Sequence, residues 1–299
     1  MQHRGSLWQH TRHPGPCCAG WWGLRSGGAL LLALGWSTRP DGRLHVWVLD
    51  VEGDAVLVQT PGAQYVLIDG GADPPTLTLA LGETLPFWQR KLAAVVLTHG
   101  DEKRLPAQVA VLERYSADIV LLPAALPDEA TSRELLRLLE VYQVPYHVAQ
   151  PGDQLAIDAL TLTIFDTGTS AERLALRLDY GGTRVQIGPA TASSEAAPLT
   201  LLVYPWTQPL DAGQLAAWQP QAIVFTRAGT DTEGVPLTFS ERAQISGVPA
   251  ERLYHPGLHG TIELIGDGQQ ACIMTARCPD YGSSAGCAAR NAACRAVFR

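Results

Sequence analysis

The sequence predicts an α/β protein of four layers, an αββα sandwich in which two β-sheets pack face to face between outer helices. Two observations lead to this prediction. The chain carries two successive blocks of mixed strands and helices, and each block contains a tight hairpin, at Pro61-Gly62 and at Gly181-Gly182. A single doubly wound sheet is the alternative, and the hairpins count against it because a purely parallel sheet would not contain them.

The first block consists of short apolar runs, typical of buried strands, followed by stretches with the apolar spacing of a helix. Gly70-Gly71 ends the third strand, and Asp128 is expected to cap a helix whose apolar side chains lie between residues 135 and 142. The expected strands cover residues 44–50, 55–60, 64–69, 93–98 and 118–122, and the first expected helix covers residues 105–115.

The second block repeats this alternation after residue 160. Apolar runs flank the second hairpin, and two amphipathic stretches are expected to be helices. The expected strands cover residues 160–165, 174–180, 184–187, 199–204, 222–226, 253–255, 261–265 and 271–275, and the expected helices cover 211–218 and 238–246.

The organised domain is therefore expected to span residues 42–275. Residues 1–41 are interpreted either as a disordered leader or as the remnant of a membrane helix, because an apolar run ends at Leu34 with tryptophans on both sides. Residues 276–299 are rich in Cys, Ala and Gly and are predicted to form a disordered tail. The chain has no C-x-x-C pair, so we expect no zinc knuckle and no specific role for the tail cysteines.

Charge and motifs exclude several classes of function. The net charge is −7, with an excess of arginine before residue 44 and a more acidic remainder. An acidic body argues against tight binding of duplex DNA, which requires clustered cations. The sequence contains no phosphate-binding G-x-x-x-x-G-K-[ST] loop and no G-x-S-x-G nucleophile elbow.

The most informative stretch is residues 97–104, LTHGDEKR. It follows a predicted buried strand, and it carries His99 and Asp101, whose side chains are of metal-ligand type. Lys103 and Arg104 follow, and their charged side chains cannot coordinate a metal ion. The stretch therefore looks like a ligand run that has lost half of its ligands.

The order of such segments resembles the metallo-β-lactamase-type domain at the C-terminal end of ComEC, the membrane channel protein of bacterial DNA uptake. The resemblance spans roughly residues 42–268. Residues 49–55 (LDVEGDA) resemble L-D-V-G-Q-G-D-A, and 60–63 with 67–71 (TPGA, LIDGG) resemble T-P-G-G and L-I-D-x-G. Residues 97–104 meet L-T-H-x-D-x-D-H, 178–181 (LDYG) meet L-x-Y-G, and 259–262 (HGTI) meet D-G-T-I. The resemblance implies a metallo-β-lactamase sandwich.

The same comparison implies that most metal ligands are missing. Pro189 stands where the resemblance places the metal-bridging aspartate of T-G-D, and Trp206 and Thr207 stand in place of the two histidines of V-P-H-H-G-S. The predicted vestigial cleft is therefore lined by Asp69, His99, Asp101, Lys103, Arg104, Pro189, Trp206 and Thr207. Asp69, His99 and Asp101 would be the ligands if a single ion bound. We expect no cofactor, with Zn or Mn as the alternative.

Three functions remain open. The first is a non-catalytic metallo-β-lactamase-fold domain of a ComEC-related protein of DNA internalisation. The second is an active metal-dependent nuclease or phosphodiesterase, as the family's chemistry implies. The third is a binding module in which Lys103 and Arg104 hold a phosphate or single-stranded DNA. The resemblance implies a membrane channel domain and single-stranded DNA as partners. It also implies a location at the bacterial inner membrane, with a soluble fragment as the alternative.

Overall fold

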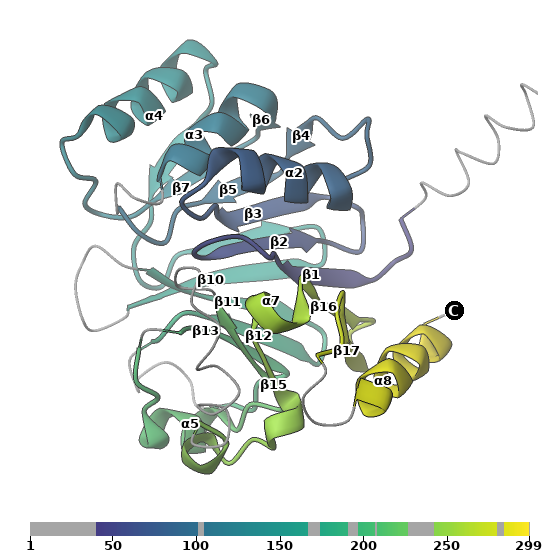
Figure 1. The fold of residues 1–299 in the computed structure, drawn as a ribbon. Coiled ribbons are helices and arrows are strands. Elements are labelled where there is room, and N and C mark those ends of the chain that lie inside the picture. The colour runs from purple at the N-terminus through teal and green to yellow at the C-terminus, as the bar shows by residue number, and fades with distance from the viewer. Residues whose placement is uncertain are drawn as a thin grey trace, which may run out of the picture. The chain divides into compact units, whose positions relative to one another are not determined.

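The computed structural model has four layers of secondary structure, and Figure 1 shows their order. The structure describes residues 40–100, 105–166, 174–190, 197–206, 208–226, 242–279 and 284–298. These residues belong to a unit that begins at Pro40. The predicted αββα sandwich is confirmed, whereas the interpretation of residues 1–39 lies outside the described part. Across the described ranges, no helix has both the length and the apolar character needed to cross a membrane.

The first sheet contains strands from both ends of the domain. Its strands are β1 (Leu44–Val48), β2 (Ala55–Gln59), β3 (Tyr65–Asp69), β5 (Ala94–Val96), β7 (Val120–Leu122), β8 (Tyr146–Val148), β16 (Ile262–Gly266) and β17 (Ala271–Thr275). Their order is β17-β16-β1-β2-β3-β5-β7-β8. The strands from β17 to β3 pair antiparallel, and those from β3 to β8 pair parallel. The sheet is therefore mixed, as the first hairpin predicts.

The second sheet is also mixed. Its strands are β9 (Gln154–Ile157), β10 (Leu160–Asp166), β11 (Leu174–Tyr180), β12 (Thr183–Ile187), β13 (Leu201–Pro205), β14 (Ile223–Thr226) and β15 (Leu253–Tyr254). They lie in the order β15-β14-β13-β12-β11-β10-β9, antiparallel from β9 to β12 and parallel from β12 to β15. A separate two-stranded sheet joins β4 (Lys91–Leu92) to β6 (Ser116–Ala117).

Helices cover the outer faces of both sheets (Figure 1). The helices are α2 (Pro74–Thr84), α3 (Leu105–Arg114), α4 (Ala130–Val141), α5 (Ala212–Trp218), α7 (Pro256–His259) and α8 (Ser284–Val297), with a 3-10 turn η1 (Ala250–Arg252). Residues 242–246 are helical too, whereas the start of the helix expected at 238–246 lies outside the described residues. Apolar side chains form one core between the sheets, a second beneath α2, α3 and α4, and a third beneath α5.

The prediction of a disordered tail at residues 276–299 is wrong, because residues 284–297 form α8. The segment is rich in alanine, which has the highest helix propensity, and its small side chains hide this signal from hydrophobic periodicity. The expectation that the tail cysteines have no role is also wrong. Cys278 pairs with Cys287, and Cys294 pairs with Cys272 of β17.

The capping prediction for α4 is wrong as well. Glu129 is the N-cap residue and makes no capping hydrogen bond through its side chain. Asp128 instead forms an ion pair with Arg133, with 2.8 Å between Oδ1 and Nη1. An arginine one turn into the helix thus draws the carboxylate away from the backbone amides.

Candidate functional site

The parallel pairing of β3 and β5 builds the candidate site. Ile68 lies opposite Val96, so the residues that follow the two strands emerge together at one edge of the sheet. Asp69 ends β3, and Thr98 and His99 follow β5. The second sheet reaches the same place, because the amide of Leu174, the first residue of β11, donates to the carbonyl of Thr98 at 2.9 Å. The site therefore lies where the two sheets meet.

Asp69 is held by Thr98. The residue is 6% exposed, and its Oδ1 accepts from the backbone amide of Thr98 at 2.8 Å. Its Oδ2 accepts from the hydroxyl of the same threonine. Asp69 has a φ of 55°, in the left-handed region that aspartate tolerates better than most residues. Both carboxylate oxygens thus bind the neighbouring strand end, which is a structural role.

His99 lies beside this pair. Its Nδ1 contacts the Thr98 hydroxyl and is 3.8 Å from Oδ2 of Asp69, and its side chain is 13% exposed. The structure therefore brings together two of the three predicted single-ion ligands, Asp69 and His99. The third, Asp101, lies outside the described residues, as do Lys103, Arg104 and Thr207.

A small cavity opens beside these side chains. Asp54, Asp69, Thr98 and His99 line one part of it. Gly188 and Pro189, which follow β12, line another part together with the last residues of β13 and β14, Pro205 and Thr226. Apolar side chains complete the lining: Val56, Leu174, Ile187 and Val203. Its volume is about 20 Å³, measured for the centre of a water-sized sphere. One water molecule needs roughly 10–15 Å³ on this measure. The cavity thus has room for about one water molecule or one ion.

Trp206, which follows β13, belongs to a cluster of aromatic rings that meet edge to face and one guanidinium. The ring centroid of Trp206 is 5.4 Å from that of Phe225 and 5.0 Å from that of His255. The guanidinium carbon of Arg242 lies 4.2 Å from the Trp206 ring centroid, and its Nη2 donates to the Trp206 carbonyl at 2.7 Å. At residue 206 the resemblance places a metal-binding histidine, whereas this chain has a tryptophan that makes a cation–π contact.

The other histidines in the described part of the chain have partners of their own. His45 binds Asp41 and Glu263, and His147 binds Asp153. His255 and His259 contact each other across α7, where the His255 amide donates to Nδ1 of His259 at 3.2 Å. Burial, the largest effect, and the nearby arginines lower the pKa of His259 to about 4, despite an opposing backbone hydrogen bond. This imidazole is therefore neutral at neutral pH, and its hydrogen bond to the His255 amide stabilises the short helix α7.

These donors do not fit the paired metal ions that the fold family implies. Two bridged ions about 3.5–4 Å apart need ligands from several loops and an open position for a substrate. Here the carboxylate of Asp69 is bound to Thr98, Pro189 offers no donor atom, and the Trp206 side chain packs against Arg242. Across the ranges that the structure describes, no group of three or more His, Cys, Asp or Glu side chains is arranged to hold a metal ion.

Two participants in this region are not evident from the sequence. Thr98 is a small polar residue next to a conspicuous histidine, and only the pairing of β3 with β5 reveals that it binds Asp69. Arg242 stacks on a ring 36 positions away in sequence, and no spacing rule connects the two. Asp54, in the segment LDVEGDA, also lines the cavity.

Comparisons with known proteins agree with this architecture. The metallo-β-lactamase fold protein YhfI from Bacillus subtilis matches with a TM-score of 0.54 and 15% identity, over 75% of this chain and 100% of that one. Zn²⁺-bound PqqB from Methylobacterium extorquens matches with a TM-score of 0.53 and 14% identity, over 71% of this chain and 85% of that one. No protein-family model matches the sequence, and no curated protein does. At these identities the likeness shows the fold.

Proposed function

We propose that this metallo-β-lactamase-fold chain is a non-catalytic domain of a ComEC-related protein of DNA internalisation. The observation that carries the proposal is the state of the cleft. Both carboxylate oxygens of Asp69 accept hydrogen bonds from Thr98, and the cavity beside them has a volume of only about 20 Å³. A scaffold that keeps its strand ends in place while its ligand positions hold Pro189 and Trp206 is suited to contacts and not to hydrolysis.

The relation to ComEC rests on the sequence segments that resemble that protein, in their order along residues 42–268. It carries with it a membrane channel domain and single-stranded DNA as partners, and a location at the bacterial inner membrane. Single-stranded DNA would be held through its phosphates, which cationic side chains bind. Lys103 and Arg104 are the candidates, because they follow the cleft residue His99 by four and five positions in the sequence. These partners belong to the proposal.

The competing function is metal-dependent cleavage of nucleic acid. The test incubates the purified full chain with labelled single-stranded and duplex DNA, with added Zn²⁺ or Mn²⁺ and with a chelator. We expect no cleavage above buffer in any condition and no difference between the parent and His99→Ala. Metal-dependent cleavage that disappears in His99→Ala would overturn the proposal, because only a working site at residue 99 explains that pattern.

Binding of single-stranded DNA is tested separately by fluorescence anisotropy. The parent is expected to bind, with an affinity that falls as salt rises, and Lys103→Glu/Arg104→Glu is expected to weaken binding. Lys91→Glu is the matched control, since Lys91 is an exposed lysine whose Nζ lies 2.6 Å from Asp118. Binding that is equal in the parent and in the double variant would remove these two cations from the proposal.

A further inference from the structure

A second and larger cavity lies at the opposite ends of β13 and β14 from the cleft. Thr200 and Gln221, which precede these strands, line one wall. Residues of β16, β17 and α8 line the other walls, and the volume is about 320 Å³. Ligand sites in proteins measure roughly 300–1,000 Å³, so this groove matches a small organic molecule. It shares no lining residue with the cleft.

Helix α8 forms one wall of the groove and is firmly attached to the sheet edge. The disulfide between Cys272 and Cys294 lies in that wall. The side chain of Asn291 pairs with the edge strand β17, accepting from the amide of Thr275 at 3.2 Å and donating to its carbonyl at 2.9 Å. The groove is therefore a built feature, completed by residues beyond the segment that resembles ComEC.

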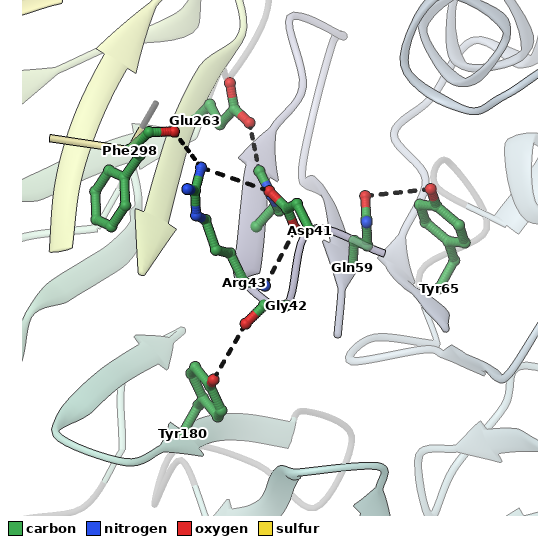
Figure 2. A network of polar contacts seen from close by, with 9 residues as sticks. Asp41, Gly42, Arg43, Gln59, Tyr65, Tyr180, Glu263 and Phe298 are labelled. Atoms are coloured by element: carbon green, nitrogen blue, oxygen red, sulfur yellow. Dashed lines mark hydrogen bonds and ion pairs between the residues drawn. The ribbon is translucent and has the colours of Figure 1, made fainter. Parts of the chain in front are cut away.

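The far end of α8 is tied to the start of the domain. Figure 2 shows the guanidinium of Arg43 between Asp41 and the carbonyl of Phe298. The Arg43 guanidinium carbon also lies 5.1 Å from the Phe298 ring centroid. A cation at the carbonyl end of a helix complements the helix dipole. The C-terminal half of α8 is thus held both to β17 and to the start of the domain, and with it this wall of the groove.

The chemistry of the groove is cationic at the mouth and apolar inside. Arg252 and Arg290 are its two charged lining residues, and both are exposed. Burial, the largest effect, raises the pKa of the Tyr254 phenol even though the nearby charge of Arg290 lowers it, so the phenol stays protonated at neutral pH. The acidic neighbour is Glu251, which leaves an excess of one positive charge among the three.

The interior is made of aliphatic side chains from both sheets and from the helix. Leu264 and Ile273 come from the first sheet, and Ala222 precedes β14 of the second. Ala293 and Val297 complete the surface from α8, where Val297 is 58% exposed. An apolar surface next to two guanidinium groups fits a ligand with an apolar body and an anionic head.

We propose that this groove between α8 and the edges of the two sheets binds a small organic anion, a carboxylate or phosphate carried on a short aliphatic body. The guanidinium groups of Arg252 and Arg290 bind the head, because their planar donors match the oxygens of either anion. The aliphatic body lies along Leu264, Ile273 and Ala293 and leaves water.

The test titrates the full chain, with its disulfides intact, by calorimetry with octyl phosphate and octanoate below their micelle concentrations. Both are expected to bind at one site per chain. Inorganic phosphate lacks the body and octyl glucoside lacks the charge, so each is expected to bind roughly tenfold more weakly or not at all. Equal binding of octyl glucoside and octyl phosphate would contradict the proposal.

Two variants separate the charge from the shape of the groove. Arg252→Gln/Arg290→Gln is expected to weaken octyl phosphate roughly tenfold or more, since it removes hydrogen bonds from charged donors. Ala293→Trp fills the groove while keeping both cations and is expected to abolish binding. Arg295→Gln is the matched control, because Arg295 lies exposed on α8 and does not line the groove. Unchanged affinity in the double arginine variant or in Ala293→Trp would overturn the proposal.

Discussion

Asp69 offers the sharpest test of how the cleft is built. If its carboxylate is a structural acceptor for Thr98, then removing it must cost stability in a chain without any metal. Asp69→Ala leaves the buried amide and hydroxyl of Thr98 without their acceptor. The substitution also places alanine at a φ of 55°, a left-handed backbone conformation that alanine disfavours and that its side chain cannot stabilise with a hydrogen bond. Asp69→Asn keeps one oxygen and a side chain that tolerates this backbone conformation.

The magnitudes follow from the contacts. Hydrogen bonds to a charged group contribute about 1.5–3 kcal/mol each, and relief of the carboxylate's own desolvation offsets part of the loss, so about 2–3 kcal/mol remains. Left-handed backbone costs alanine about 1 kcal/mol more. We therefore expect Asp69→Ala to lower the free energy of unfolding by about 3–4 kcal/mol. We expect Asp69→Asn to lower it by about 1 kcal/mol.

Urea unfolding of both variants and the parent, in chelator-treated buffer, measures these differences. The slope against urea must stay constant for the comparison to report on stability. A destabilisation of Asp69→Ala below about 1 kcal/mol would refute the structural role of this carboxylate, because a buried pair of hydrogen bonds to a charge cannot be that weak. Equal losses in the alanine and asparagine variants would refute the argument from the backbone and the remaining oxygen.

Two further predictions concern the first sheet, at β17 and at β1. Cys272→Ser/Cys294→Ser removes a disulfide between residues 22 positions apart. From the chain entropy that the disulfide removes, we expect the free energy of unfolding, measured in urea, to fall by about 3 kcal/mol. A fall near zero would show that α8 is held without this disulfide. Burial opposes the charge on His45, but hydrogen bonds to Glu263 and Asp41 outweigh it and raise its pKa above 6.5. This contribution is complete below pH 6.5 and is lost as pH rises through the raised pKa, so the stability difference between parent and His45→Gln should shrink from pH 6 to pH 9. A difference that is flat or grows across that range would contradict the assignment.

The fold could be predicted from the sequence because its signals are local. Apolar runs separated by turn residues place β1 to β3 and β10 to β12 within one or two residues of the observed bounds. Helix α2 escaped prediction because it begins with Pro74-Pro75 and its apolar side chains mark no clear face. Helix α8 escaped because alanine supplies propensity without periodicity, and because disulfide partners cannot be read from spacing.

The candidate site was only half predictable. Asp69 and His99 stand out as ligand-type residues after buried strands, and the parallel pairing of β3 and β5 does bring them together. The contacts of the residues that replace the missing ligands could not be predicted, because their partners are distant in sequence. The stack of Trp206 with Arg242 joins residues that only the folded second sheet and its helix bring into contact.

The most direct measurement is the metal content of the purified full chain, compared between the parent and His99→Ala. Each protein is saturated with Zn²⁺ or Mn²⁺, dialysed, and analysed for bound metal per chain. Ions held by other cysteines or histidines appear equally in both proteins, so the difference isolates the cleft. We expect the two proteins to differ by less than about 0.2 ion per chain. A parent that retains about two ions, both lost in His99→Ala, would contradict this expectation.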